Sequence, residues 1–283
     1  MALWPLAKGF QDWEIMKRRG KWSKGIESLL ETKGLTKYFG GLAAVNGVNF
    51  HIQEGEIISL IGPNGAGKTT FFNLITGFLR SSLGSVFYKS EMINHLPPHQ
   101  IANKGIIRTF QNTKIFPGVS VFDGVLMGCH RRLHSRTWQI LANSAYTGQE
   151  EEVVRNRVLE ILDFVGLSDR KDIGAQNLSY GEQRILEIAV ALGADPELLL
   201  LDEPTAGMNP EETRKTMDLI CKIRNQGVTM LLVEHDMNVV MGISDRVVVL
   251  DYGSKIAEGS PQEVQANEEV IKAYLGEEFL HHA

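Results

Sequence analysis

A glycine-rich stretch at 62–69, Gly-Pro-Asn-Gly-Ala-Gly-Lys-Thr, constrains the fold of this chain more than any other feature. It matches the pattern Gly-x-x-x-x-Gly-Lys-Ser/Thr, in which the backbone N–H groups of a loop converge on a phosphate group. The apolar run Ile57–Ile61 before it predicts a buried strand, and Lys68–Leu79 after it predicts a helix. A loop that merely joins strand to helix is the alternative, and the coincidence of motif and context argues against it. The sequence therefore predicts a nucleotide phosphate site.

Each residue type in this stretch has a physical task. Glycines let the backbone bend around an anion, and the helix N-terminus adds a partial positive charge. The Lys68 ammonium is expected on the β- and γ-phosphates, and the Thr69 hydroxyl on Mg²⁺. The predicted phosphate contacts are Gly62, Pro63, Asn64, Gly65, Ala66, Gly67, Lys68, Thr69 and Thr70.

A second stretch supplies the acidic groups that such a site needs. Leu198–Leu201 is four consecutive leucines, which predict a central parallel strand covered on both faces, and Asp202-Glu203-Pro204 follows. An aspartate at the end of a buried strand is the second Mg²⁺ ligand of P-loop ATPases, so Asp202 is a predicted metal ligand. Glu203 is predicted to accept a proton from the attacking water. Taken alone, the pair reads equally well as two surface carboxylates that cap a strand.

Strands alternate with helices along the chain, which predicts an α/β sheet. A mostly helical block at about 113–193 lies between two strand-rich parts and predicts an inserted subdomain. We expect a poorly ordered extension at 1–30, a main domain at 31–276 and a tail at 277–283. The remaining expected strands are Val45–Ile52, Val228–Val233, and the hairpin strands Val247–Leu250 and Lys255–Ala257. The remaining expected helices are Glu150–Phe164, one from Ser179 to about Ala194, Glu211–Asn225, Met237–Gly242 and Glu263–Leu275.

Charge and cysteine content narrow the class of protein. The formal net charge of −5 argues mildly against a nucleic-acid partner. Cys129 and Cys221 lie far apart without metal-ligand spacing, which indicates a reducing compartment. The sequence contains no apolar run of about 18 residues that predicts a membrane span, and the N-terminus does not resemble a signal peptide. A cytoplasmic location is therefore expected.

The first thirty residues differ from the rest in composition. Six basic residues lie between Lys8 and Lys24, and three of the four tryptophans lie at Trp4, Trp13 and Trp22. A poorly ordered extension is the expectation. A basic, aromatic arm that contacts anionic lipid or a partner subunit is the alternative.

The stretch Asn177–Gln183 reads locally as the start of a helix. Ser179 has the position of an N-cap, and Glu182 follows three residues later, as in a capping box. A helix start also presents free N–H groups to an anion. Local pattern leaves open whether this start is only a cap or also faces a ligand.

These motifs together resemble the ATP-binding subunit of ABC transporters over about Leu35–Gly276. The resemblance implies a P-loop NTPase of the ABC type, with a mostly parallel core sheet, an antiparallel β subdomain and an inserted α-helical subdomain. It also implies roles for residues outside the phosphate loop. Phe39 would stack on adenine with Val45 nearby, Gln111 would sense Mg²⁺ and the attacking water, and His235 would contact the γ-phosphate. Leu178–Gln183 would be the signature motif, with Ser179 and Gly181 on the nucleotide, and Ala206–Asn209 would be the dimer-contact loop.

The resemblance implies ATP and Mg²⁺ as ligands and a second ATPase subunit, identical or similar, that closes head to tail around two ATP molecules. Transmembrane permease subunits would be the membrane partners, which places the chain peripherally at the cytoplasmic face of the inner membrane. Within the family, Arg108–Asn112, Leu178–Gly181 and Ala206–Pro210 resemble importers for branched-chain amino acids. Close relatives act on urea, short amides or lipopolysaccharide, so these substrates stay open.

Three residues depart from the family pattern. Tyr180 replaces a glycine of the signature motif, Glu182 replaces its glutamine, and Asn209 replaces the usual aspartate of the dimer-contact loop. Tyr180 would either crowd the nucleotide contact or lean outward onto a partner.

Two other classes of protein fit the sequence less well than a transport ATPase. A soluble member of the same ATPase class that acts in DNA repair or translation is disfavoured by the single P-loop, the absence of a heptad repeat and the negative charge. A GTPase or small-molecule kinase is disfavoured because Asn103-Lys104-Gly105-Ile106 lacks the aspartate that reads guanine.

Overall fold

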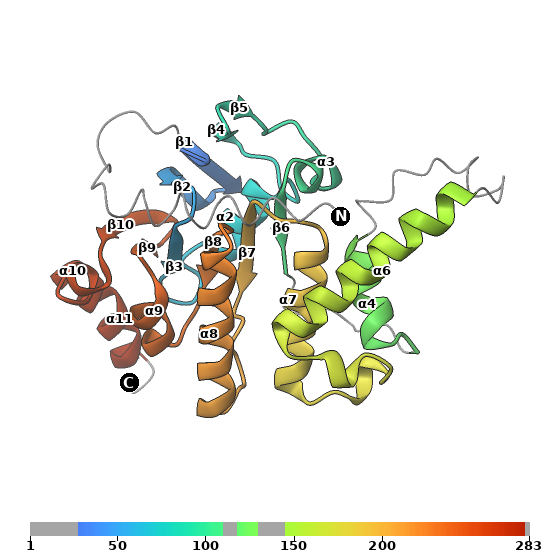
Figure 1. The fold of residues 1–283 in the computed structure, drawn as a ribbon. Helices are drawn as coiled ribbons and strands as arrows, with labels where there is room; N and C mark the ends of the chain where they lie inside the picture. The colour runs from blue at the N-terminus through green and yellow to red at the C-terminus, as the bar shows by residue number, and fades with distance from the viewer. Residues whose placement is uncertain (1–27, 110–117, 130–144, 281–283) are drawn as a thin grey trace, which may run out of the picture. The chain divides into compact units, whose positions relative to one another are not determined.

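The computed structural model of the chain describes residues 28–109, 118–129 and 145–280 (Figure 1). The described chain forms two compact units, one from the residues up to Ala102 and from Met217 onward, and one from Asn103–Thr216. The predicted extension at 1–30 falls almost entirely outside the described residues, and so does Gln111. Among the described residues, no helix combines the length and the apolar character that crossing a membrane requires.

An antiparallel sheet opens the first unit, as the fold class predicted. Its order is β2-β1-β4-β5, and every neighbouring pair is antiparallel. The sequence pattern did not reveal the start of β1, because register shifts between Thr32 and Leu35 interrupt its alternation. The strands are β1 (Leu30–Phe39), β2 (Leu42–Ile52), β4 (Leu83–Tyr88) and β5 (Glu91–Met92), and the short helix α3 (Pro98–Asn103) follows them.

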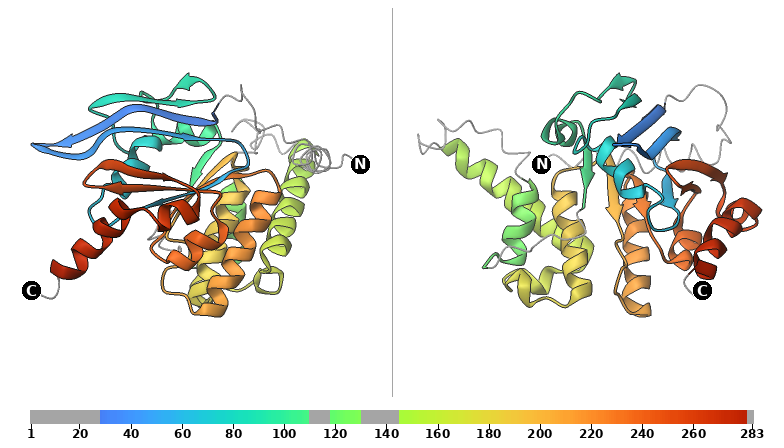
Figure 2. Two further views of the ribbon diagram at one scale, coloured as in Figure 1. Left: turned by 90° about the vertical axis from the view of Figure 1, so that its left-hand side faces the viewer. Right: turned by 180° about the vertical axis from the view of Figure 1, so that it is seen from behind.

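The first unit also holds parallel strands that frame the glycine-rich loop. β3 (Ile57–Ile61) pairs in parallel with β8 (Thr229–Val233) and with β9 (Arg246–Asp251), and β9 turns back antiparallel into β10 (Ser254–Gly259). Every residue of β3 and β8 is buried, which fits their mostly apolar sequence, in which Ser59 and Thr229 are the polar residues. Figure 2 shows the β9–β10 hairpin as a layer next to β2, and the N–H of Asn46 in β2 donates to the carbonyl oxygen of Gly253 in the hairpin turn at 2.8 Å.

The helices of this unit cover its strands. α2 (Lys68–Ile75) packs on β2 through the rings of Phe71 and Phe50, whose centroids lie 5.2 Å apart. α9 (Met237–Ile243) and two later helices bury a cluster against β3 and β9. The members of that cluster are Ile61, Val240, Val247, Val249, Val264 and Val270.

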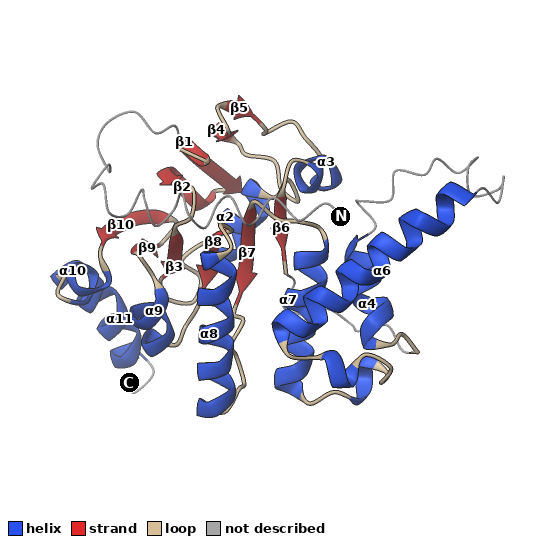
Figure 3. Ribbon diagram, in the orientation of Figure 1, coloured by secondary structure: helices blue, strands red, loops and turns tan. Residues whose placement is uncertain are grey.

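The closing helix predicted at Glu263–Leu275 is wrong as a single element. The chain forms α10 (Pro261–Gln265) and then α11 (Glu268–Leu280), separated by a short break (Figure 3). Asn267 starts the second helix, because its side-chain oxygen accepts the N–H groups of Glu269 at 2.8 Å and Val270 at 3.3 Å.

The second unit contains two parallel strands and the helical insertion. β6 (Ile106–Arg108) pairs with β7 (Leu198–Asp202), and every residue of β7 is buried, as predicted from its leucines. The helices α4 (Val121–Gly128), α6 (Ala145–Val165) and α7 (Tyr180–Gly193) pack on one another (Figure 1). α8 (Pro210–Asn225) begins here and ends in the first unit. The predicted α/β class, with mostly parallel core strands, an antiparallel sheet and a helical insertion, is confirmed.

Candidate functional site

The loop between β3 and α2 has two positions that only glycine fits. Gly62 and Gly67 have φ values of 148° and 101°. A Cβ added to Gly62 would lie 2.0 Å from the carbonyl oxygen of Leu250 in β9, and one added to Gly67 would lie 2.3 Å from that of Ala44 in β2. Because both positions press against neighbouring strands, any larger residue displaces the loop.

The helix that follows the loop starts in a way that suits an anion. α2 has Gly67 as its N-cap, without a side-chain cap hydrogen bond, and no acidic residue in its first turn. Its first N–H groups therefore keep their capacity to bind a ligand, and the helix dipole favours negative charge there. Loop and helix together fit a phosphate group.

The ammonium group of Lys68 lies within this loop. The side chain is 7% exposed, and its Nζ donates to the carbonyl oxygens of Gly62 and of Pro63, the latter at 2.9 Å. Thr69, the next residue, is exposed at the start of α2. The cation and the hydroxyl predicted for phosphate and metal thus lie at the same helix start.

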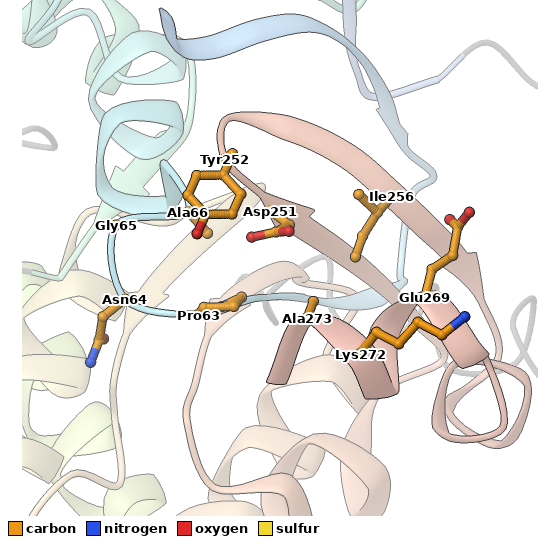
Figure 4. Close-up of a pocket in the computed structure, with 10 residues that line it drawn as sticks. All are labelled: Pro63, Asn64, Gly65, Ala66, Asp251, Tyr252, Ile256, Glu269, Lys272 and Ala273. Atoms are coloured by element: carbon orange, nitrogen blue, oxygen red, sulfur yellow. The ribbon is translucent and has the colours of Figure 1, made fainter. Parts of the chain in front are cut away.

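A pocket of about 550 Å³ adjoins the loop within the first unit (Figure 4). Four of the predicted phosphate contacts, Pro63–Ala66, line it, whereas Lys68 and Thr69 do not. Tyr252, at the turn of the β9–β10 hairpin, is 85% exposed at the pocket. The lining residues are Pro63–Ala66, Asp251, Tyr252 and Ile256 of the hairpin, and Glu269, Lys272 and Ala273 of α11.

The two residues predicted near adenine differ in exposure. Phe39 ends β1 with 48% of its surface exposed, and the Lys37 ammonium lies 5.3 Å from its ring centroid. An exposed ring has a free face for stacking. Val45 in β2 is fully buried, so its side chain offers no surface to a ligand, and its burial gives that prediction no support.

His235 is the second residue after β8 in the first unit. The residue is exposed, and its backbone N–H donates to the carboxylate of buried Glu234 at 3.0 Å. Asp236 next to it caps α9 by accepting the N–H of Asn238 at 2.8 Å. The position of His235 is therefore fixed by the end of a buried strand and the start of a helix.

Asp202 lies at the end of β7 in the second unit, and it is ion-paired. Its carboxylate is 6% exposed, and the Oδ2 atom accepts a hydrogen bond from Nη2 of Arg108 at 2.7 Å. Arg108, itself 8% exposed, was not among the predicted site residues. Strand topology could have identified Arg108 as a site residue. Arg108 ends β6, and the carboxyl ends of neighbouring parallel strands lie at the same edge of a sheet.

Glu203 has an unusual backbone. Its φ of 50° lies in the left-handed region, which costs a non-glycine residue about 1–2 kcal/mol. A tight turn follows, because the Glu203 carbonyl oxygen accepts the N–H of Ala206 at 3.2 Å. Strain of this kind at a polar residue after a buried strand is typical of functional positions.

The capping box predicted at the start of α7 is confirmed. The Ser179 hydroxyl accepts the N–H of Glu182 at 3.2 Å, and the Glu182 carboxylate accepts the N–H of Ser179 at 2.9 Å. That backbone hydrogen bond lowers the pKa of Glu182, which favours the charged, capping form. Ser179 is exposed, so the cap does not exclude a second role at the surface.

Tyr180 lies over its own chain, in an arrangement that the sequence did not suggest. A Cβ added to Gly207 would lie 3.1 Å from Cε1 of Tyr180, so the ring covers the glycine of the loop Ala206–Asn209. The Tyr180 hydroxyl accepts a hydrogen bond from Nη2 of Arg184 at 2.9 Å. The start of α7 and the loop Ala206–Asn209 therefore contact each other within the second unit.

The predicted site residues fall into two groups, one in each unit. Phe39, the glycine-rich loop and His235 belong to the first unit, while Ser179, Gly181, Asp202 and Glu203 belong to the second. Gln111 lies outside the described residues. The assembly of these groups around one nucleotide stays a prediction.

Comparison with known proteins adds independent findings. A family model described as "ABC transporter" matches residues 45–206, and one described as "Branched-chain amino acid ATP-binding cassette transporter" matches residues 254–280. The chain is 44% identical to the high-affinity branched-chain amino acid transport ATP-binding protein LivG of Salmonella typhimurium, over 89% of this chain and 99% of that protein. It is also 44% identical to BraF of Pseudomonas aeruginosa, which has the same description, over 88% and 98%.

Solved structures agree with this likeness. The chain superposes on a nucleotide-free ATP-binding cassette from an ABC transporter with a TM-score of 0.77 and 31% identity, covering 88% of this chain and 99% of that one. The ADP conformation of an ATP-binding cassette gives a TM-score of 0.78, also at 31% identity and with the same coverage.

Proposed function

The chain belongs to the ABC transporter family of ATP-binding cassettes and is an ATPase, and we propose that it powers an importer of branched-chain amino acids. The observation that carries the proposal is the 44% identity to LivG over 99% of that protein's length. The match of residues 254–280 to the branched-chain amino acid model supports it independently, because this segment lies outside the general ABC match. Ile256, Glu269 and Lys272 of the pocket belong to that segment.

Transport measured with the natural partners tests the substrate. The chain is reconstituted in proteoliposomes with its permease subunits and a substrate-binding protein. We expect ATP-dependent uptake of leucine, isoleucine or valine. ATP-dependent uptake of urea or short amides without these amino acids, or extraction of lipopolysaccharide, would replace the proposed substrate while keeping the ATPase.

The proposed mechanism assigns each predicted residue one task. The loop amides and Lys68 hold the phosphates of ATP, Phe39 stacks on adenine, and His235 contacts the γ-phosphate. Glu203 accepts a proton from the attacking water, which attacks the γ-phosphorus as the bond to ADP breaks. Thr69, Asp202 and Gln111 are oxygen donors of the kind Mg²⁺ prefers, and the ion when bound neutralises charge on the β- and γ-phosphates.

Two such subunits are proposed to close head to tail around two ATP molecules. Ser179 and the amides near Gly181 contact the ATP held by the other subunit, as a helix start contacts an anion. Hydrolysis removes the γ-phosphate that links the subunits, so the pair opens and moves the permease subunits. We place the chain peripherally at the cytoplasmic face of the membrane, where those permeases present their docking surfaces.

The chain carries a matched control for the role of Ser179. Ser179 and Ser260 both start helices through a capping box. Ser179→Ala and Ser260→Ala should each lower the melting temperature by about 2–4 °C, the effect of a lost N-cap. Only Ser179→Ala should also weaken dimerisation driven by a non-hydrolysable ATP analogue, by about 100-fold, because a dimer of the variant loses one hydrogen bond to a charged group at each of its two sites. Equal dimerisation of the two variants in analytical ultracentrifugation would make Ser179 a cap and nothing more.

A further inference from the structure

The ion pair between Arg108 and Asp202 is among the most buried charge pairs of the second unit. The two side chains are 8% and 6% exposed, and Nη2 lies 2.7 Å from Oδ2. In the same unit, Arg184 and Glu187 are 10% and 12% exposed, and the Asp195 carboxylate that pairs with Arg157 is 36% exposed. A pair this buried is held tightly, because each charge lacks the screening of water.

The ion pair lies where the proposed metal ligand is. Asp202 is the proposed metal ligand, and Arg108 ends the neighbouring parallel strand β6. Thr109 continues the pairing, because its N–H donates to the Leu200 carbonyl oxygen at 3.0 Å. The ends of the two strands are thus fixed in register, which keeps the guanidinium of Arg108 within reach of the carboxylate of Asp202.

A buried carboxylate requires a compensating cation, and here a side chain supplies it. Mg²⁺ bound to a nucleotide takes most of its ligands from phosphates and water, and only one or two from the protein. A divalent cation without nucleotide depends far more on protein carboxylates. The positive charge of Arg108 beside Asp202 therefore weakens the binding of a divalent cation without nucleotide more than the binding of a cation that arrives with ATP.

We propose that Arg108 is a positioning residue that serves as the resident counter-ion of Asp202 and prevents the site from taking a divalent cation without ATP. The inference rests on the proposed role of Asp202 as a metal ligand. It adds a function for Arg108, because the site then takes up a metal ion only when nucleotide phosphates also bind that ion. Metal loading is thereby tied to ATP binding.

Direct metal binding to the nucleotide-free chain tests this proposal. Mn²⁺, which replaces Mg²⁺ and is visible by electron paramagnetic resonance, is titrated into the full-length protein without nucleotide. Arg108→Gln removes the charge and should bind Mn²⁺ about tenfold more tightly than the parent chain, the scale on which the partners of metal ligands alter affinity. Arg108→Met repeats the test with an apolar side chain of similar length. Arg108→Lys keeps the charge and should bind as weakly as the parent.

Two controls separate this role from a structural one. Arg246→Gln breaks a comparable pair, in which Arg246 lies 3.3 Å from Glu56 in the first unit, and it should leave Mn²⁺ affinity unchanged. Asp202→Asn added to Arg108→Gln should abolish the gained affinity. Mg²⁺ alone should raise the melting temperature of Arg108→Gln and leave that of the parent unaltered.

Each other outcome has a defined meaning. Unchanged Mn²⁺ affinity in both neutral variants would reduce Arg108 to a structural partner and overturn the proposal. Weaker Mn²⁺ binding in them would overturn it too, because Arg108 would then orient Asp202 for the metal. ATP hydrolysis and amino-acid uptake by the parent chain test the proposed function separately, so a failure of the counter-ion role leaves that function standing.

Discussion

Glu203→Gln is expected to lower ATP turnover about 100- to 10,000-fold, the range that a positioned general base contributes. The amide keeps the shape of the carboxylate but cannot take a proton from water. ATP binding should persist, since the loop at 62–69 is untouched, so ATP-bound dimers should accumulate. Phosphate release measures the first effect, and size-exclusion chromatography with ATP measures the second.

The backbone of Glu203 makes this substitution a clean test. Its φ of 50° is equally costly for glutamate and glutamine, so the variant should unfold at the temperature of the parent chain. Glu197 offers a matched control, because it is an exposed glutamate that precedes the same strand, β7. Glu197→Gln should hydrolyse ATP normally. Normal hydrolysis in Glu203→Gln as well would remove Glu203 from the role of base.

Features encoded by neighbouring residues were predictable from sequence. The buried strands β3 and β7 are mostly apolar, with Ser59 in β3 and Asp202 at the end of β7 as their polar residues, and both form where their composition predicts them. The capping box of α7 needs only Ser179 and Glu182, three residues apart, and it forms as predicted. In each case the information lies within one element, so tertiary packing has little opportunity to override it.

Features that depend on distant residues were not predictable. Arg108 and Asp202 are 94 residues apart, and their contact follows from the pairing of β6 with β7. The ring of Tyr180 finds its place on Gly207 only because the start of α7 lies beside the loop after β7. At the break between α10 and α11, the side chain of Asn267 caps the second helix. The helical periodicity of the sequence continues across this position, so the periodicity does not reveal the break.

Gly67→Ala is expected to weaken ATP binding about 100-fold, the cost of losing two hydrogen bonds to charged phosphate at about 1.5 kcal/mol each. The new methyl group would lie 2.3 Å from the Ala44 carbonyl oxygen. A carbon–oxygen contact needs about 3.3 Å, so the loop must shift by about 1 Å. The amides at the start of α2 would move with it, away from the positions that a phosphate requires. Equilibrium dialysis with labelled ATP measures the loss.

Gly55→Ala isolates the cause of that loss. Gly55 has a φ of 75°, so alanine is strained there as it is at position 67, but a Cβ at Gly55 meets nothing within 4 Å. We expect Gly55→Ala to lose about 1 kcal/mol of stability and to bind ATP like the parent chain. If both variants bound ATP normally, the contact with β2 would not set the loop's geometry. If both lost binding, backbone strain in the unit would be the cause. Loss in Gly67→Ala alone identifies the close approach of loop and strand as what shapes the phosphate site.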